Sequence, residues 1–371
     1  MESLSQLPAN AAAPLVDVVE SASDAARLRQ PPLLIRGSLE DYLDGLGLGR
    51  GPLRAQRIGE GHSNATFVIE RDGFEAVLRR PPRPPYPKHA HNVLREARVQ
   101  EALADTAVPV PQILVTCRSD EVLGAPFYLM ERLHGQVVTA RLPAELDDAG
   151  ARRRMIDSLV DSLAALHAVD PAAVGLQDWN RGPDFLERQL NLFDKLWLVN
   201  KVREIPELSG VREWLREHQP ADAASTLVHG DFRLGNVMYE PSSSGTIDAV
   251  LDWELITVGD PMTDLGYLLS TFTEPGDPES PLLGLGGVLR GGGFPGREYV
   301  AARYAEKSGR SLENLRWHVA FAFWRTAVGL EGYYKRAVAG LTDDPFNHAL
   351  KTGIPQLASC AAATAFDGEF V

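Results

Sequence analysis

The sequence is poor in cysteine. Only two cysteines, Cys117 and Cys360, occur among 371 residues, and they are far apart in the chain. Two thiols cannot build the disulfide framework of a small secreted scaffold or a zinc site based on several cysteines. The low cysteine content indicates a reducing, cytoplasmic setting.

Long apolar runs are also lacking. No stretch approaches the roughly 20 apolar residues that a helix needs to cross a bilayer. The longest small, apolar run, residues 357–366, is Ala-rich and too short. The N-terminus has neither a basic region nor the apolar core of a secretory signal. We therefore expect a soluble protein without a membrane partner.

Basic residues are fewer than acidic residues. Lys and Arg total 37 against 50 for Asp and Glu, which gives a formal net charge of −13. Affinity for phosphate backbones comes from a basic surface, so a nucleic-acid partner is not expected. The composition is otherwise that of a globular protein, with 44% hydrophobic and 23% charged residues. At roughly 150 residues per domain, the length favours two domains or one large two-lobed domain.

The chain changes character near residue 134. Residues 1–36 read as an N-terminal extension, and residues 37–133 as a β-rich nucleotide-binding lobe. In that lobe we predict one helix at 92–104. We predict β-structure at 54–68, 75–80, 113–117 and 127–131. Residues 134–371 read as a helical catalytic and substrate-binding lobe. There we predict a β-like island at 226–255 and helices at 152–167, 185–200, 211–217, 261–270, 297–309 and 312–339, with a mobile Gly-rich loop at 284–296.

The most specific chemical signal lies in the β-like island. There the sequence HGDFRLGN, which we call the HGD loop (residues 229–236), stands between two apolar runs, and Asp252 ends the second run. Asp231, Asn236 and Asp252 form an oxygen-rich set without thiols, which suits Mg²⁺ that shares substrate phosphates. The spacing matches the catalytic loop of phosphoryl-transfer enzymes, with Gly230 in place of an arginine. We expect these three side chains to converge on a divalent ion in a crevice between the lobes.

Each of these residues could instead have an ordinary structural role. The segment from His229 to Asp231 could be an ordinary hydrogen-bonded turn, and Asp252 a cap at a strand end. Each residue taken alone favours such a structural role, but the joint pattern favours a phosphotransfer site.

The first lobe contains a second set of candidate residues, which could contact the phosphates of a nucleotide. Gly59 and Gly61 lie between two predicted strands and resemble a hairpin over phosphates, although an ordinary Gly-rich turn has the same composition. Arg79 stands where a strand lysine would contact phosphates, and Glu96 on the next helix is its natural partner. Arg80 is a rival for that role, and solvated surface charges are the alternative for the pair.

These segments together resemble the aminoglycoside phosphotransferase/choline kinase-like (APH) family, relatives of protein kinases. The resemblance rests on GEGHSN, VLRR, the helical Glu96, FYLMERLHG, HGDFRLGN and VLDWE. VLRRPP, ADTAVPVP, DWELITVGDPMTDLGYLL and FWRTAVGLEGYYKRAVAG further resemble the phosphotransferase branch associated with acyl-CoA dehydrogenases. The resemblance implies an α+β, protein-kinase-like two-lobed fold with a small β-rich N-lobe and a larger, mostly helical C-lobe.

The resemblance also implies roles for individual residues. Asp231 is implied as the catalytic base, with Asn236 and Asp252 as Mg²⁺ ligands. His229 and Arg233 are implied as supports of the loop. The nucleotide, ATP or GTP, is implied to contact Gly59, Gly61, Ser63, Asn64, Arg79, Glu96, Met130, Glu131 and Leu133, the last three around an interlobe hinge. The substrate candidates are Glu254, Arg325, Glu331 and Tyr334.

Structural roles are expected for other polar and aromatic residues. Asp260 is a good N-cap for the helix at 261–270, and Asp264 could brace the HGD loop through buried hydrogen bonds. Trp317, Phe321 and Trp324 have the helical spacing of core residues.

The function expected from these observations is ATP- and Mg²⁺-dependent phosphorylation of a small-molecule hydroxyl, with a hydroxyacyl-CoA-type acceptor suggested by the branch resemblance alone. The alternatives are an aminoglycoside-type antibiotic phosphotransferase, a non-catalytic nucleotide-binding pseudokinase and a metal-dependent hydrolase. We expect a monomer or a homodimer.

Overall fold

The computed structural model describes residues 16–59, 64–84, 91–223, 225–240, 245–278 and 283–370. The chain divides into two compact units: unit 1 contains residues 1–97 and 113–132, and unit 2 contains residues 98–112 and 133–371. No helix of the described residues is long and apolar enough to cross a membrane.

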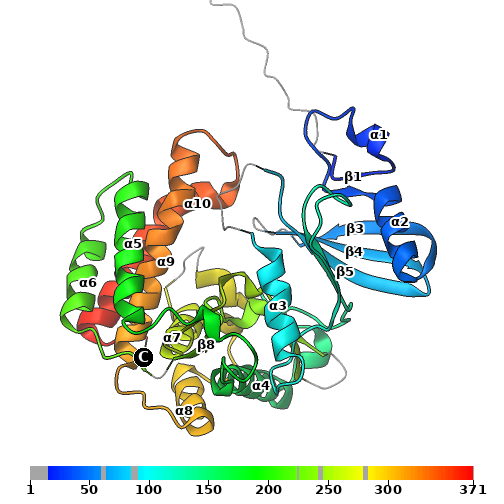
Figure 1. Cartoon of the computed structure of the whole chain (residues 1–371). Coiled ribbons are helices and arrows are strands. Elements are labelled where there is room, and N and C mark those ends of the chain that lie inside the picture. Colours follow the sequence, from blue (N-terminus) through cyan, green and yellow to red (C-terminus); the bar gives the residue numbers. More distant parts are fainter. Residues whose placement is uncertain are drawn as a thin grey trace, which may run out of the picture. The chain divides into compact units, whose positions relative to one another are not determined.

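Unit 1 is built on an antiparallel five-stranded sheet in the order β3-β4-β5-β7-β6. Its strands are β3 (Arg50–Ile58), β4 (Ala65–Asp72), β5 (Phe74–Arg80), β6 (Ile113–Cys117) and β7 (Phe127–Met130). In β4 buried residues alternate with more exposed ones, because successive side chains of a strand point to opposite faces. Helix α2 (Arg36–Leu46) packs on β3 (Figure 1). The buried faces of sheet and helix form one core that includes Leu39, Phe67 and Phe127.

The described part of the predicted extension, residues 16–36, forms regular structure. Strands β1 (Val18–Val19) and β2 (Leu34–Ile35) pair in parallel around the short helix α1 (Ala22–Ala25). Asp17 forms ion pairs with Arg57 of β3 and with Arg83. Burial would raise the pKa of Asp17, but these two guanidinium groups outweigh it and hold that pKa below its usual value. Residues 16–36 are therefore bonded to the rest of unit 1.

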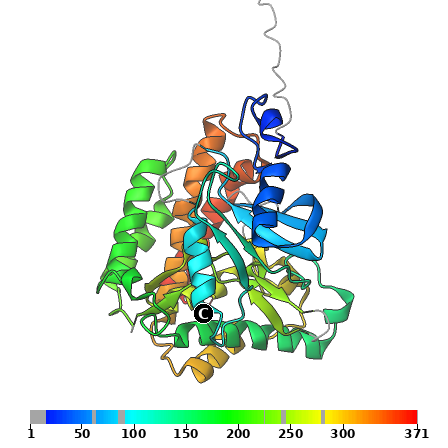
Figure 2. The ribbon, with the colours of Figure 1, turned by 45° about the vertical axis from the view of Figure 1, so that its right-hand side comes forward.

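Unit 2 is mostly helical. Its helices are α4 (Ala149–Ala168), α5 (Phe185–Asn200), α6 (Pro206–Glu217), α7 (Met262–Thr271), α8 (Arg297–Ser308), α9 (Leu315–Val338) and α10 (Pro345–Ala362). Helix α9 is central, because it contacts α5, α6, α7 and α10. Figure 2 shows α5 and α6 side by side along one flank of unit 2. As predicted, Trp317, Phe321 and Trp324 of α9 are core residues, each 3% exposed or less.

Two short antiparallel strand pairs are set among these helices. Strand β8 (Thr226–Val228) pairs with β11 (Thr257–Gly259), and β9 (Val237–Tyr239) pairs with β10 (Ile247–Val250). Strands β8, β9 and β10 lie within the β-like island predicted at 226–255, and β11 lies just beyond its end. Helix α3 (Val93–Leu103) begins in unit 1, and its last residues belong to unit 2.

The prediction of a mobile loop at 284–296 is wrong for most of that segment, because residues Leu283–Gly291 form 3-10 helix. Hydrogen bonds attach it to the rest of unit 2: the Val288 N–H donates to the Thr139 carbonyl at 2.9 Å, and Arg290 donates to the carbonyls of Asp277 and Pro278. The glycine content of the segment indicated a flexible backbone, but it could not show these hydrogen bonds to distant parts of the chain.

Candidate functional site

The HGD loop connects β8 to β9, and Asp252 follows the end of β10. The Leu251 N–H donates to the Asn236 carbonyl at 2.8 Å, which extends the β9–β10 pairing by one step. This hydrogen bond places the residue before Asp252 directly beside Asn236. The two segments that carry the predicted metal ligands are thus neighbours.

Asp231 and Asn236 are joined inside the HGD loop. The side-chain amide of Asn236 donates to the Asp231 carbonyl at 2.8 Å and to Asp231 Oδ2 at 2.7 Å. Both amide protons are used, so Oδ1 is the atom with which Asn236 can coordinate a cation. The Asp231 side chain is 23% exposed, so its carboxylate is accessible while its direction is fixed.

Asp252 has a left-handed backbone, with φ of 64°. Few residues other than glycine adopt this conformation, and such strain is found most often at functional sites. Trp253, which follows it, is buried and its indole N–H donates to the Val250 carbonyl at 3.0 Å. The chain therefore turns sharply at Asp252, at the end of a buried strand.

The donor chemistry here fits Mg²⁺. An amide oxygen from Asn236 and a carboxylate from Asp252 are hard oxygen ligands, and Mg²⁺ is usually bound by one or two carboxylates together with substrate phosphates. Among the described residues, no group of three His, Cys, Asp or Glu side chains is placed to hold a metal ion.

Asp264 of α7 accepts hydrogen bonds from the backbone of the HGD loop, as the sequence predicted. Its carboxylate accepts the backbone N–H of His229 at 2.6 Å and that of Gly230 at 2.8 Å. The buried His167 lies 3.2 Å from the same carboxylate and 2.7 Å from the Tyr304 hydroxyl. Burial would raise the pKa of Asp264, but the hydrogen bonds that its carboxylate accepts, from His167 first and also from the Gly230 N–H, outweigh burial and lower that pKa. Asp264 is thus an ionised anchor for the loop backbone.

The protonation of both histidines follows from their partners. His229 is fully buried, its Nε2 faces the Leu251 carbonyl at 2.9 Å, and its Nδ1 accepts the Asp231 N–H at 3.2 Å. We therefore assign the neutral tautomer with the proton on Nε2. Burial lowers the pKa of His167, which is also neutral, with Nε2–H toward Asp264 and Nδ1 accepting from Tyr304.

Cationic and aromatic groups surround Asp231 on its other sides. Arg233 Nε lies 3.5 Å from Asp231 Oδ1. Arg325 of α9 donates to the Gly230 carbonyl at 2.9 Å, and its guanidinium lies over the ring of Tyr267. Burial, with the charge of Asp231 and a hydrogen bond to it, raises the pKa of the Tyr267 phenol, which thus remains protonated. Sequence reasoning missed Tyr267, whose only signal was its place three residues after Asp264 on the same helix.

Unit 1 contains a second polar cluster, centred on Glu96. The Glu96 side chain is 1% exposed, and its Oε2 accepts from Arg79 Nε at 2.7 Å and from the Tyr128 hydroxyl at 3.2 Å. The Asn64 amide donates to Oε1. A buried carboxylate needs such partners, because an unpaired charge in the interior is very costly. Tyr128 was not predicted; it is brought here by the pairing of β7 with β5.

Arg79 and Arg80 differ in their contacts and in their exposure. Arg80 is 4% exposed and donates to the backbone carbonyls of Pro81, Leu33 and Leu123. These contacts are structural. Arg79, whose side chain is 15% exposed, is the more accessible of the two.

Other predicted nucleotide residues have simple placements. Gly59 follows β3 with φ of 75°, a conformation that suits glycine. Gly61 and Ser63 lie outside the described residues. Met130 ends β7, and the boundary between the units falls between Glu131 and Leu133.

The four substrate candidates are not brought together. Glu254 is half-buried just after Asp252, and Arg325 contacts the HGD loop. Glu331 is fully buried and accepts hydrogen bonds from Arg203 and from the Val202 N–H. Tyr334 packs its ring against the same guanidinium, Arg203, at 4.3 Å. Glu331 and Tyr334 thus belong to a structural cluster between α9 and the α5–α6 connection.

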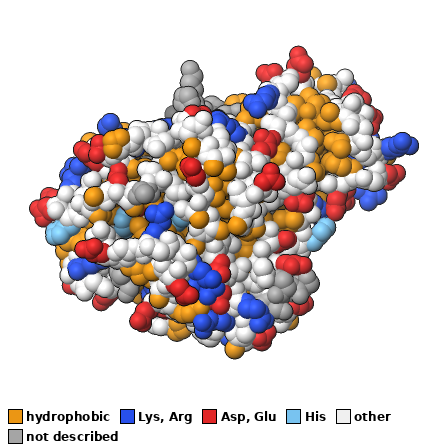
Figure 3. All heavy atoms as spheres, turned by 60° about the horizontal axis from the view of Figure 1, so that its bottom comes forward, with side chains coloured by type: hydrophobic (Ala, Val, Ile, Leu, Met, Phe, Trp, Pro, Cys, Tyr) orange, Lys and Arg blue, Asp and Glu red, His pale blue; other side chains and the backbone are white. Residues whose placement is uncertain are grey.

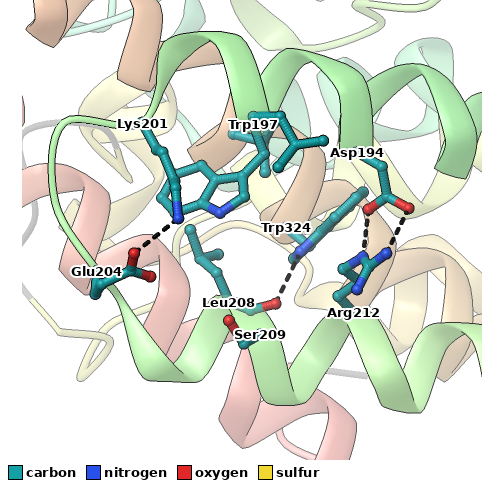
Figure 4. A pocket seen from close by; sticks show the side chains of 10 residues that line it. Asp194, Trp197, Lys201, Glu204, Leu208, Ser209, Arg212 and Trp324 are labelled. Carbon is teal, nitrogen blue, oxygen red and sulfur yellow. Dashed lines mark hydrogen bonds and ion pairs between the residues drawn. The ribbon is translucent and has the colours of Figure 1, made fainter.

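A separate hollow lies between α5, α6 and α9 (Figure 4). Its volume is about 210 Å³ and its walls include Trp197 and Trp324. The charged side chains at its edge are paired with one another, Arg212 with Asp194 and Lys201 with Glu204. None of the predicted site residues lines it. On the face drawn in Figure 3, acidic and basic side chains are interspersed.

Comparisons with known proteins show the family to which the chain is similar. The family model of the "Phosphotransferase enzyme family" (APH) matches residues 54–301, which include Glu96, the HGD loop and Asp252. Acyl-CoA dehydrogenase family member 10 of Mus musculus is 33% identical over 84% of this chain. Family member 11 of Gallus gallus is 32% identical over 87% of it. The matches cover 29% and 42% of those two proteins, so the chain spans less than half the length of these relatives.

Solved structures show the same architecture. A candidate aminoglycoside phosphotransferase from Ralstonia eutropha matches with a TM-score of 0.74 and 30% identity, over 89% of this chain and 98% of that one. The aminoglycoside phosphotransferase APH(4)-Ia, solved with AMP-PNP and hygromycin B, matches with a TM-score of 0.57 and 18% identity, over 88% of this chain and 98% of that one. These matches confirm the predicted α+β, kinase-like two-lobed fold.

Proposed function

The chain belongs to the phosphotransferase enzyme family (APH), and from this premise we propose that it transfers the γ-phosphoryl group of ATP or GTP to a hydroxyl group of a small molecule. The observation that carries the proposal is the geometry of Asp231. Its carboxylate is accessible, is held by the Asn236 amide and stands beside the segment of Asp252. A carboxylate fixed next to two oxygen ligands is what phosphoryl transfer to a hydroxyl requires.

In the proposed reaction, Asp231 accepts a hydrogen bond from the acceptor hydroxyl and takes its proton. The acceptor oxygen forms a bond to the γ-phosphorus, the bond to the β–γ bridging oxygen breaks, and the nucleoside diphosphate leaves. His229, Arg233 and Asp264 hold the HGD loop in place while this happens. The rate comes from positioning and electrostatic stabilisation, since no covalent enzyme intermediate is needed.

The Asn236 Oδ1 and the Asp252 carboxylate are the proposed ligands of Mg²⁺. When bound, the ion neutralises charge on the phosphate oxygens. In unit 1, Arg79 Nε donates to Glu96, and we propose that the Arg79 guanidinium also contacts phosphate. We propose that Gly59, Gly61, Ser63 and Asn64 cover the phosphates and that Met130, Glu131 and Leu133 adjoin the base.

We propose an anionic acceptor of the hydroxyacyl-CoA type. Two guanidinium groups, Arg233 and Arg325, lie close to the Asp231 carboxylate or its backbone. Positive charge beside the reacting group favours an anionic acceptor over a cationic aminosugar. The names of the curated relatives, acyl-CoA dehydrogenase family members, support the same acceptor class.

The test is a screen for phosphotransfer with Mg²⁺-ATP. Hydroxyacyl-CoAs, aminoglycosides, amino alcohols and sugars are offered in parallel, and the products are examined by mass spectrometry for the gain of one phosphoryl group. We expect transfer to a hydroxyacyl-CoA, and its loss in Asp231→Asn and Asp252→Ala with folding intact. Normal turnover by Asp231→Asn would refute the assignment of the base.

An aminoglycoside acceptor remains the second candidate, because the Ralstonia eutropha protein at 30% identity is described as a candidate aminoglycoside phosphotransferase. Transfer to an aminoglycoside but to no acyl-CoA would favour it. Nucleotide binding without transfer to any acceptor would instead favour the pseudokinase alternative. Release of inorganic phosphate without an acceptor would favour a hydrolase.

A further inference from the structure

The direction of Asp231 depends on the peptide bond that precedes it. Gly230 has φ of 87°, and a Cβ at this position would lie 2.9 Å from Leu255 Cβ and 3.0 Å from the Leu255 carbonyl oxygen. Glycine is therefore favoured at this position, directly before Asp231, because a side chain would be strained and would meet the Leu255 backbone. Because a peptide unit is planar, the orientation of the Gly230 carbonyl also determines that of the Asp231 N–H.

Two side chains hold opposite edges of this peptide unit. The Asp231 N–H donates to His229 Nδ1 at 3.2 Å, and the Gly230 carbonyl accepts from Arg325 Nη2 at 2.9 Å. His229 belongs to the HGD loop itself, whereas Arg325 comes from α9. Arg325 therefore connects the loop to the central helix of unit 2.

The Arg325 side chain is itself held in place. Its guanidinium lies 4.9 Å from the ring centroid of Tyr267 on α7 and 5.9 Å from that of Phe321, one turn earlier on α9. Both rings are buried. Among the described residues, no carboxylate forms an ion pair with Arg325. Its planar head is thus supported by aromatic faces and directed at a carbonyl, an arrangement that lysine cannot reproduce in full.

We propose that Arg325 is a positioning residue for Asp231, which sets the angle of the base by holding the Gly230 carbonyl. This inference rests on the proposed function, in which Asp231 is the base. It replaces the sequence-based expectation that Arg325 binds the substrate. It also gives α9 a role in the reaction, through a contact with the backbone of the loop.

The test compares Arg325→Met, Arg325→Lys and Arg316→Met in otherwise unchanged protein. Arg316 is a matched control, because it lies earlier on α9, donates to the carbonyls of Thr364 and Ala365, and stacks over Trp214. We expect Arg325→Met to lower kcat by about 10 to 100-fold with little change in the KM for ATP, since a misplaced catalytic group costs factors of this size. Arg325→Lys should recover part of the loss, and Arg316→Met should change thermal stability without changing kcat.

Amide hydrogen exchange adds a readout that needs no acceptor. In Arg325→Met, exchange should accelerate in peptides that cover residues 229–236 and stay unchanged in those that cover α4. An unchanged kcat and unchanged exchange in Arg325→Met would overturn the inference, as would a rise in acceptor KM alone, which would make Arg325 a substrate ligand. If Asp231→Asn were fully active, the proposed function would fail, whereas a dead Asp231→Asn beside a normal Arg325→Met would refute only the positioning role.

Discussion

Asn236 donates both protons of its side-chain amide to Asp231, one to the backbone carbonyl at 2.8 Å and one to Oδ2 at 2.7 Å. One side chain thus closes the HGD loop and directs its carboxylate. Because both protons are used, the remaining amide oxygen is the atom that can bind a cation. The proposed base and the proposed metal ligand are therefore mechanically coupled.

This coupling predicts that Asn236→Ala impairs more than metal binding. We expect kcat to fall by about 100-fold even at saturating Mg²⁺, because Asp231 loses the donor that orients it. Asn236→Asp should be no better, since it places a second carboxylate against Asp231. Steady-state kinetics over a Mg²⁺ titration measure both effects. Asn191→Ala, at an exposed position on α5 where the side chain accepts from Arg216, is the control. Full activity of Asn236→Ala at high Mg²⁺ would contradict the coupling.

The cluster around Glu96 predicts a loss of stability when Arg79 is removed. Glu96 would lose the Arg79 guanidinium, with which it forms an ion pair in the interior next to the donors Asn64 and Tyr128. We expect Arg79→Ala to lower the free energy of unfolding by about 2 to 3 kcal/mol, near the lower limit for broken buried pairs because Arg79 is partly exposed. Urea denaturation measures this change.

Arg132→Ala is the matched control for Arg79, because Arg132 pairs with Glu70 and Glu75 at the surface of the same sheet. Surface pairs of this kind contribute at most about 1 kcal/mol. Equal effects of Arg79→Ala and Arg132→Ala would show that the burial of Glu96 does not matter for stability. A selective rise in the KM for ATP in Arg79→Ala would add support for phosphate binding.

Local patterns in the sequence were sufficient for many elements. The helix predicted at 185–200 coincides with α5, and the strand predicted at 113–117 with β6. Asp264 was also expected to brace the loop, because an acid near the start of a buried helix needs donors. Helix α10 was missed: Pro355 in its interior argues against a helix, but packing against α9 stabilises it.

Contacts between distant segments could not be predicted. Tyr128 reaches Glu96 only because β7 pairs with β5, and the helical spacing that placed Glu331 on α9 could not show that it faces Arg203 and not the HGD loop. Periodicity assigns a residue to a face of its element. Which element covers that face is decided by tertiary packing.

Buried histidine predicts a pH dependence of stability. His318 on α9 is 2% exposed and its Nδ1 has no hydrogen-bond partner within the described part of the chain. Burial lowers the pKa of His318 to about 4, against the opposing charges of Asp260 and Asp222. Between this value and the ordinary 6.5, the unfolded chain binds a proton that the folded chain does not. The free energy of unfolding should therefore fall by up to about 3 kcal/mol as the pH drops through that window.

Urea denaturation between pH 4.5 and about 8 tests this dependence. In His318→Leu the decline below pH 6.5 should be clearly smaller than in the unchanged protein, because that titrating group is gone. His218→Leu, which removes an exposed histidine stacked on Trp214, should leave the decline unchanged. Identical pH profiles for His318→Leu and the unchanged protein would contradict the assignment.

The crossing of α7 and α9 predicts that Gly266 is indispensable. A Cβ on Gly266 would lie 2.5 Å from the His318 carbonyl oxygen and 2.6 Å from its carbon, both in the backbone of α9, where nothing flexible can yield. Gly266→Ala should push the helices apart and lower the free energy of unfolding by about 3 kcal/mol, the upper range for overpacking. Because α7 carries Asp264 and α9 carries Arg325, the folded fraction should also turn over more slowly.

Gly329→Ala on α9 is the control for Gly266→Ala. The atom nearest to a Cβ on Gly329 would be 4.0 Å away, so this substitution should stabilise the protein by up to about 1 kcal/mol. If Gly266→Ala were as stable and active as Gly329→Ala, the close contact of the two helices would not be what holds the HGD loop between its anchors.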